Sequence, residues 1–138
     1  IGYSFGAALA PVVINRAAAN VQKRIAAQVL ISPDPEAVFE VKVGDWFGGA
    51  HHDNTIPLVP ELSTTKIPVV CVHGVEEREP SVCRKVERSI IQTVELPGGH
   101  HYNGDYDRLA EAILSAISVS VTGMSNLAPK RSEPALMF

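Results

Sequence analysis

The sequence has few cysteines, no cluster of basic residues and no long apolar run, and each shortage excludes a class of protein. Only two of the 138 residues are cysteines, and no Cys-x-x-Cys pair is present, which argues against a zinc site. The net charge is -3 and no Lys/Arg cluster occurs, so nucleic acid is not an expected partner. The apolar runs are too short to span a membrane, so no transmembrane helix is predicted.

The remaining composition is that of an ordinary globular protein. Hydrophobic residues make up 46% of the chain and charged residues 20%. Since the chain starts with Ile1 at what resembles the end of a strand, we expect residues 1–121 to form the C-terminal part of a longer α/β domain. Residues 122–138 show no periodicity and are predicted to be a disordered tail.

The first residues carry the motif on which the functional hypothesis depends. Gly2-Tyr3-Ser4-Phe5-Gly6 reads G-x-S-x-G and continues into an Ala-rich helical segment, as in a nucleophile elbow. A serine at the tip of such a tight strand-to-helix turn has strained backbone, which requires small residues two positions before and after it. Ser4 is therefore the candidate nucleophile.

The hydrophobic pattern predicts an α/β fold. Nearly continuous apolar runs at residues 25–31, 67–74 and 90–96 are typical of strands buried on both faces of a parallel sheet. Residues 5–19 and 105–121 have helical periodicity. The predicted inner face of the second helix consists of Tyr106, Leu109, Ala110, Ile113, Leu114 and Ile117. The alternation in residues 37–44 indicates a strand or hairpin arm. These elements fit a partial α/β-hydrolase fold with a parallel sheet, flanking helices and missing N-terminal strands.

Acidic residues and histidines follow two of the later strands, in the order required for a Ser…acid…His triad. Glu77 is the preferred acid because it lies three residues after Gly74, where a turn can double back, and Glu76 is the alternative. His100 is the preferred base because the two preceding glycines let the loop approach the elbow. His101 is the alternative base and could instead pack beneath the loop.

Other residues are expected to surround this triad. The Phe5 amide is expected to form one half of an oxyanion hole, with a second donor upstream of the chain start. We predict no metal and no cofactor, because His51, His52 and Asp53 are adjacent and better explained as a solvated loop. The candidate substrate-lining side chains are aromatic, and they are Tyr3, Trp46 and Phe47.

The spacing of Cys71 and Cys83 leaves two alternatives open. The residues form a disulfide if the compartment is oxidising, and otherwise they are two buried thiols.

Several segments together resemble the VirJ/AcvB family of bacterial virulence proteins. They are residues 1–7, residues 39–49, residues 70–74 with Cys83, and residues 96–106, of which the Gly-Gly-His-His-x-x-Gly-Asp-Tyr run is the most specific. The resemblance implies a periplasmic α/β-hydrolase-like domain associated with type IV secretion. For the AcvB branch it implies hydrolysis of the lysyl ester of lysyl-phosphatidylglycerol. It also favours a Cys71–Cys83 disulfide. The chain departs from the family at residues 75–78, where a more acidic run is usual.

Two hypotheses for the function follow. The first is a serine hydrolase acting on a small-molecule or lipid head-group ester, with Glu40, Asp45 or Asp53 as candidate partners of a cationic lysyl group. The second is a non-catalytic periplasmic module that binds type IV secretion substrates or machinery.

Overall fold

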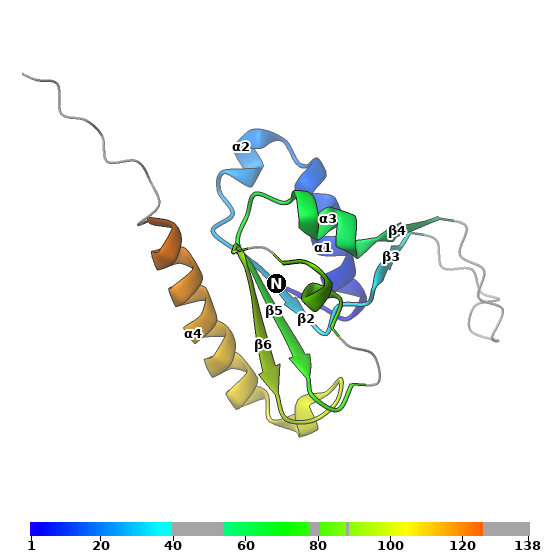
Figure 1. The fold of residues 1–138 in the computed structure, drawn as a ribbon, viewed down its shortest axis with the longest axis vertical. Helices are drawn as coiled ribbons and strands as arrows, with labels where there is room; N and C mark the ends of the chain where they lie inside the picture. The colour runs from blue at the N-terminus through cyan, green and yellow to red at the C-terminus, as the bar shows by residue number, and fades with distance from the viewer. Residues whose placement is uncertain (40–53, 78–80, 88, 126–138) are drawn as a thin grey trace, which may run out of the picture.

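The computed structural model describes residues 1–39, 54–77, 81–87 and 89–125, and its centre is a parallel four-stranded sheet. The strand order is β1 (Gly2–Tyr3), β2 (Gln28–Ile31), β5 (Val69–Gly74) and β6 (Ile91–Leu96). Every neighbouring pair is parallel, so the carboxyl ends of all four strands lie at the same edge of the sheet (Figure 1). The predicted α/β class with a parallel sheet flanked by helices is confirmed.

Strands β2 and β5 are buried along their whole length, as their apolar runs predict. Because successive side chains of a strand point to opposite faces, each strand contributes to two separate cores. Val29, Ile31 and Val70 belong to the core beneath α4 (Tyr106–Ser125). Leu30, Val69 and Cys71 belong to the core on the opposite face.

Helices cover both faces of this sheet. Helix α1 (Phe5–Arg16) and helix α3 (Leu58–Thr64) contribute Ala7, Leu58 and Leu62 to the second core. Helix α4 packs on the first core through Leu109 and Ile113. Figure 1 shows α4 on one side of the strands, with α1 and α3 on the other. The sheet is thus the middle of three layers, and the carboxyl edge of its strands is where side chains from separate segments can meet.

Three predictions about the helices are wrong in detail. The first helix ends at Arg16, because the C-cap Ala17 is extended, and a separate short helix α2 (Ala19–Gln22) follows. Tyr106, Ala110 and Leu114 are exposed, because the packed stripe of α4 begins at Leu109, and Ala110 and Leu114 each lie about 100° around the helix from the buried residues Leu109 and Ile113. The predicted tail starts too early, since α4 continues to Ser125; residues 126–138 lie outside the described part.

The remaining elements are short. Strand β3 (Glu36–Val38) pairs antiparallel with β4 (Thr55–Pro57), which is consistent with the predicted hairpin arm as far as residue 38. The 3-10 helix η2 (Val82–Lys85) lies between β5 and β6, and η3 (Tyr102–Gly104) follows the last strand.

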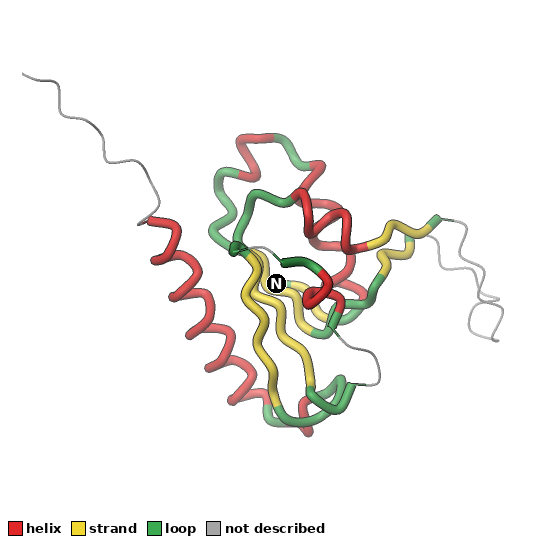
Figure 2. The backbone as a smooth tube through the Cα atoms, in the orientation of Figure 1, coloured by secondary structure: helices red, strands yellow, loops and turns green. Residues whose placement is uncertain are grey.

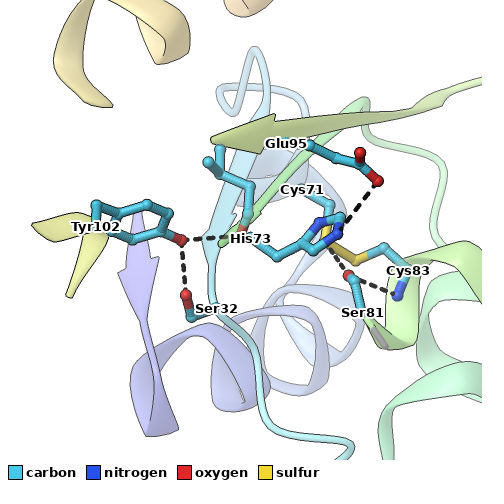
Figure 3. Close-up of a disulfide and its surroundings, with 8 residues drawn as sticks. Ser32, Cys71, His73, Ser81, Cys83, Glu95 and Tyr102 are labelled. Carbon is cyan, nitrogen blue, oxygen red and sulfur yellow. Dashed lines mark hydrogen bonds and ion pairs between the residues drawn. A yellow bond between two sulfur atoms is a disulfide. The ribbon is translucent and has the colours of Figure 1, made fainter. Parts of the chain in front are cut away.

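A disulfide joins Cys71 of β5 to Cys83 of η2, as the family resemblance implied (Figure 3). Both residues are almost fully buried, at 0% and 1% exposure. The bridge ties η2 to the middle of the sheet and encloses the turn that carries Glu77.

Candidate active site

Ser4 lies at the tip of the turn between β1 and α1 in the conformation required of a nucleophile elbow. It is the N-cap of α1, with φ 51° and ψ -120°, a backbone region that non-glycine residues rarely adopt. The Ser4 amide donates to the Ile31 carbonyl at 2.8 Å, and the Ala7 amide donates to the Ser4 carbonyl at 2.9 Å. The first bond anchors Ser4 to the neighbouring strand β2 and the second anchors it to helix α1, so both stabilise its strained backbone.

The two glycines of the motif have different roles. A Cβ on Gly2 would lie 2.3 Å from the Gly6 carbonyl oxygen, so the tight turn requires glycine at position 2. A Cβ on Gly6 would meet no described atom within 4 Å outside its own helix. The expectation that both positions must lack a side chain therefore holds sterically for Gly2 only.

The loop after β6 brings His100 to the serine. His100 Nε2 lies 3.0 Å from Ser4 Oγ, although 96 residues separate them in the chain. Gly98, with φ 96°, provides a turn that a side chain would strain. We call residues 97–101 the histidine loop. Figure 2 shows the loops that follow β5 and β6 side by side at the ends of their strands.

Tyr3 holds the histidine loop from the elbow side. Its hydroxyl donates to the His100 carbonyl at 3.0 Å and lies 2.9 Å from His101 Nδ1. Because the hydroxyl has one proton, a protonated His101 Nδ1 would donate the second bond. Desolvation is the main reason why the pKa of Tyr3 is raised, so the phenol stays protonated at neutral pH. His101 is exposed, so the expectation that it could pack beneath the loop is wrong.

The two candidate acids occupy different environments. Glu77 Oε1 accepts hydrogen bonds from Ser32 Oγ at 2.6 Å and from the Gly74 amide at 2.8 Å. Glu76 is exposed, and its backbone amide donates to the Gly98 carbonyl at 3.0 Å. Within the described residues no hydrogen bond joins either carboxylate to His100. The structure thus brings Ser4 and His100 together and places Glu77 in a polar cluster with Ser32 and the Gly74 amide.

Sequence reasoning missed two members of that cluster. Ser32, the residue after β2, and Tyr102, two residues after His100, are each 2% exposed and lie in left-handed backbone with φ 46° and 52°. Tyr102 Oη lies 2.6 Å from Ser32 Oγ (Figure 3). The sequence signal that could have identified Ser32 is its position directly after a buried parallel strand. A residue at that position lies at the carboxyl edge of the sheet, where such folds gather their functional groups.

Comparison with known proteins identifies the family. Residues 1–121 match the model of the family described as "Bacterial virulence protein (VirJ)". The chain belongs to this family. No curated protein and no solved structure matches the chain. The VirJ family match covers the elbow, the acidic turn and the histidine loop, so all the candidate residues described above fall within it.

The predicted oxyanion-hole donor of this VirJ family chain is at the start of α1. Phe5 is the first helical residue, so its amide has no partner within the helix. The positive end of the helix dipole also favours an anion at this point. The second donor stays a prediction.

Several predicted site residues belong to the segment 40–53, outside the described part of the chain. Trp46 and Phe47, the candidate lining residues, lie outside the described residues, as do the three candidate carboxylates Glu40, Asp45 and Asp53. His51 and His52 also lie outside them, and the described part of the chain contains no cluster of three metal-ligating side chains. In that same part, no helix is long and apolar enough to span a membrane.

Proposed function

We propose that this VirJ family chain is a serine ester hydrolase in which Ser4 is the nucleophile and His100 the general base. The observation that carries the proposal is the 3.0 Å approach of His100 Nε2 to Ser4 Oγ at an elbow with strained backbone. Strain of this kind persists only where the surrounding structure imposes it, and it is concentrated at functional sites. Hydrogen-bond contact between a serine and an imidazole is the geometry of an activated nucleophile.

The reaction follows from these positions. His100 accepts the Ser4 proton while Ser4 Oγ forms a bond to the ester carbonyl carbon, and the Phe5 amide stabilises the resulting oxyanion. The carbon–oxygen bond to the alcohol then breaks, and imidazolium donates its proton to the leaving alcohol. Water attacks the acyl-enzyme with His100 again as base, which releases the carboxylic acid and restores Ser4.

Glu77 is proposed as the acid that orients His100 and stabilises its charged form. Glu77 Oε1 is occupied by Ser32 and the Gly74 amide. In the described residues Glu77 Oε2 makes no hydrogen bond, so this oxygen is available to accept a hydrogen bond from the imidazole N–H in the substrate complex while the carboxylate stays ionised. Catalytic hydrogen bonds are often long in the free enzyme and shorten only in the complex.

The proposed substrate is an aminoacyl ester of a phospholipid head group, with lysyl-phosphatidylglycerol as the specific candidate. The choice rests on the resemblance to the AcvB branch. A periplasmic location accompanies it, supported by the Cys71–Cys83 disulfide, which persists in an oxidising compartment. Attack by Ser4 would transfer the lysyl group to the serine and release phosphatidylglycerol, and hydrolysis would then release lysine.

A fluorophosphonate probe tests whether the protein is a hydrolase. Such a probe reacts with an activated serine without requiring the natural substrate. We expect labelling that disappears in Ser4→Ala and persists in Ser63→Ala, because Ser63 Oγ is an exposed donor to the Val59 carbonyl within α3. Release of lysine from vesicles that contain lysyl-phosphatidylglycerol then tests the substrate.

One observation favours the alternative, a non-catalytic module that binds type IV secretion components. Among the described residues, Glu77 forms its hydrogen bonds with Ser32 and the Gly74 amide and none with His100, so the third member of the triad is not engaged. This alternative requires that the folded protein is not labelled by the probe at any pH between 6 and about 9, the range in which a histidine base would be active. Labelling that survives Ser4→Ala would also contradict the hydrolase.

A further inference from the structure

The polar cluster around Glu77 extends beyond the residues that the hydrolase mechanism uses. It is formed by Ser32, Glu77, Tyr102 and the Gly74 amide, at the carboxyl ends of β2, β5 and β6. Ser32 and Tyr102 come from segments 70 residues apart in the chain. Their hydroxyl groups are buried, and Figure 3 shows Tyr102 Oη directed at Ser32.

The hydrogen bonds of this cluster have a defined direction. Glu77 is a carboxylate and can only accept, so Ser32 must use its single proton for the 2.6 Å bond to Glu77 Oε1. Tyr102 must then donate to Ser32 Oγ at 2.6 Å, and its longer 3.3 Å approach to the Val72 carbonyl is secondary. Burial is the main cause that raises the pKa of Tyr102 to about 12, so the phenol keeps this proton at the pH of any ordinary assay.

We propose that Ser32 and Tyr102 are positioning residues that orient the Glu77 carboxylate toward His100. Ser32 and the Gly74 amide both bind Oε1, which restricts rotation of the carboxylate and leaves Oε2 as the oxygen open to the imidazole. Tyr102 fixes the Ser32 hydroxyl, and it belongs to the segment that directly follows the histidine loop. The inference rests on the proposed hydrolase function.

The backbone supports this role independently of the hydrogen bonds. Ser32 and Tyr102 both have positive φ, at 46° and 52°, although neither is glycine or asparagine. Backbone strain of this kind persists only when the surrounding structure imposes it, and it is concentrated at functional sites. The Ser32 amide donates to the Val72 carbonyl at 2.8 Å, so the conformation is held from β5, the strand that leads to Glu77.

The test measures the rate of fluorophosphonate labelling in Ser32→Ala and Tyr102→Phe, each of which removes one hydroxyl group. We expect Ser32→Ala to be labelled about 10-fold more slowly, and Tyr102→Phe about 3- to 10-fold more slowly, as for loss of a hydrogen bond to or near a charged group. Ser63→Ala and Tyr106→Phe are the matched controls. Both of these residues are exposed, and both variants should be labelled at the wild-type rate.

Two further measurements separate positioning from a merely structural role. If Ser32 acts through Glu77, adding Ser32→Ala to Glu77→Gln should change the rate less than 2-fold, since the effects of coupled residues are not additive. Thermal unfolding of each variant confirms that the protein is folded.

The outcomes distinguish this inference from the proposed function. Labelling that requires Ser4 but proceeds at the wild-type rate in folded Ser32→Ala and Tyr102→Phe overturns the positioning role and leaves the hydrolase intact. The positioning role is also overturned if the rate reduction in the Ser32→Ala, Glu77→Gln double variant equals the product of the two single reductions. If the wild-type protein is not labelled, the hydrolase proposal fails, and the positioning role fails with it.

Discussion

Gly74, the last residue of β5, lies directly against Gly98 of the histidine loop. A Cβ at position 74 would be 2.3 Å from the Gly98 carbonyl oxygen and 2.5 Å from that of Gly99. The Gly74 amide at the same time donates to Glu77 Oε1 at 2.8 Å. One residue without a side chain therefore lets the acidic turn and the histidine loop approach each other.

Replacing Gly74 by alanine is predicted to displace the histidine loop. The added methyl group meets backbone atoms, which cannot move aside as a flexible side chain can, so His100 should move away from Ser4. We expect a loss of about 1–3 kcal/mol in the free energy of unfolding, as for other overpacked sites. Fluorophosphonate labelling should be at least about 10-fold slower, which corresponds to 1.4 kcal/mol in the barrier.

Gly6→Ala is the matched control, because a Cβ there meets no described atom within 4 Å outside its helix. Alanine in a helix is favoured over glycine by about 1 kcal/mol, so this variant should unfold at an equal or higher denaturant concentration. Equal stability and labelling of Gly74→Ala and wild type would show that the contact between the two turns does not matter.

The disulfide is predicted to stabilise the fold. Cys71 and Cys83 are 12 residues apart, and closing a loop of this size contributes about 2–4 kcal/mol to the free energy of unfolding. The double variant Cys71→Ala, Cys83→Ala should therefore unfold at a lower urea concentration than the oxidised protein. Glu77 lies within the loop that the disulfide closes, so fluorophosphonate labelling of this double variant should also be slower than that of the wild type. A free-thiol assay that counts two thiols in unreduced protein would contradict the bridge.

The two adjacent acids are predicted to differ in their effect on turnover. Glu77→Gln should reduce the labelling rate about 10²- to 10⁴-fold, in the range reported for loss of a triad carboxylate. Glu76→Gln should have less than about 2-fold effect, since surface substitutions remote from such contacts are nearly neutral. Equal small losses in both variants would mean that neither carboxylate is the acid.

His73 is predicted to make stability fall as the pH is lowered. It is 5% exposed, and in the described part of the chain its Nδ1 has no hydrogen-bond partner. Burial lowers its pKa, the positive charge of Arg84 adds to this, and Glu77 opposes it. Glu95 Oε1 also lies 3.4 Å from His73 Nε2, but Arg84 is paired with that same carboxylate.

Proton uptake by His73 makes the free energy of unfolding fall as the pH is lowered. The folded protein binds a proton at His73 less readily than the unfolded chain, whose histidines titrate near pH 6.5. The contribution of neutral His73 to the free energy of unfolding is therefore complete above that pH and is lost as the pH falls below it. The free energy of unfolding should therefore decrease from about pH 7.5 to about pH 5.5. His73→Leu should show a smaller decrease over the same range in urea titrations. An unchanged decrease in the variant would assign the pH dependence to other groups.

Much of the framework follows from local sequence patterns. The apolar runs of β2, β5 and β6 predict buried parallel strands, because only strands covered on both faces are continuously apolar. G-x-S-x-G predicts Ser4 at a strand-to-helix turn, since the spacing of small residues reflects a steric requirement at short range. The extent of α4 was harder to predict, because the end of a helix depends on its caps and its packing as well as on periodicity.

The order of the elements and the set of residues available for chemistry follow from local patterns, since the hydrophobic period and backbone sterics act over short range. Which of these residues meet depends instead on the packing of the whole domain. The 3.0 Å contact between Ser4 and His100, and the binding of Glu77 by Ser32 and Gly74, depend on how three strand ends lie in one sheet. No local pattern contains that information, because contacts across 96 residues arise from packing and strand register.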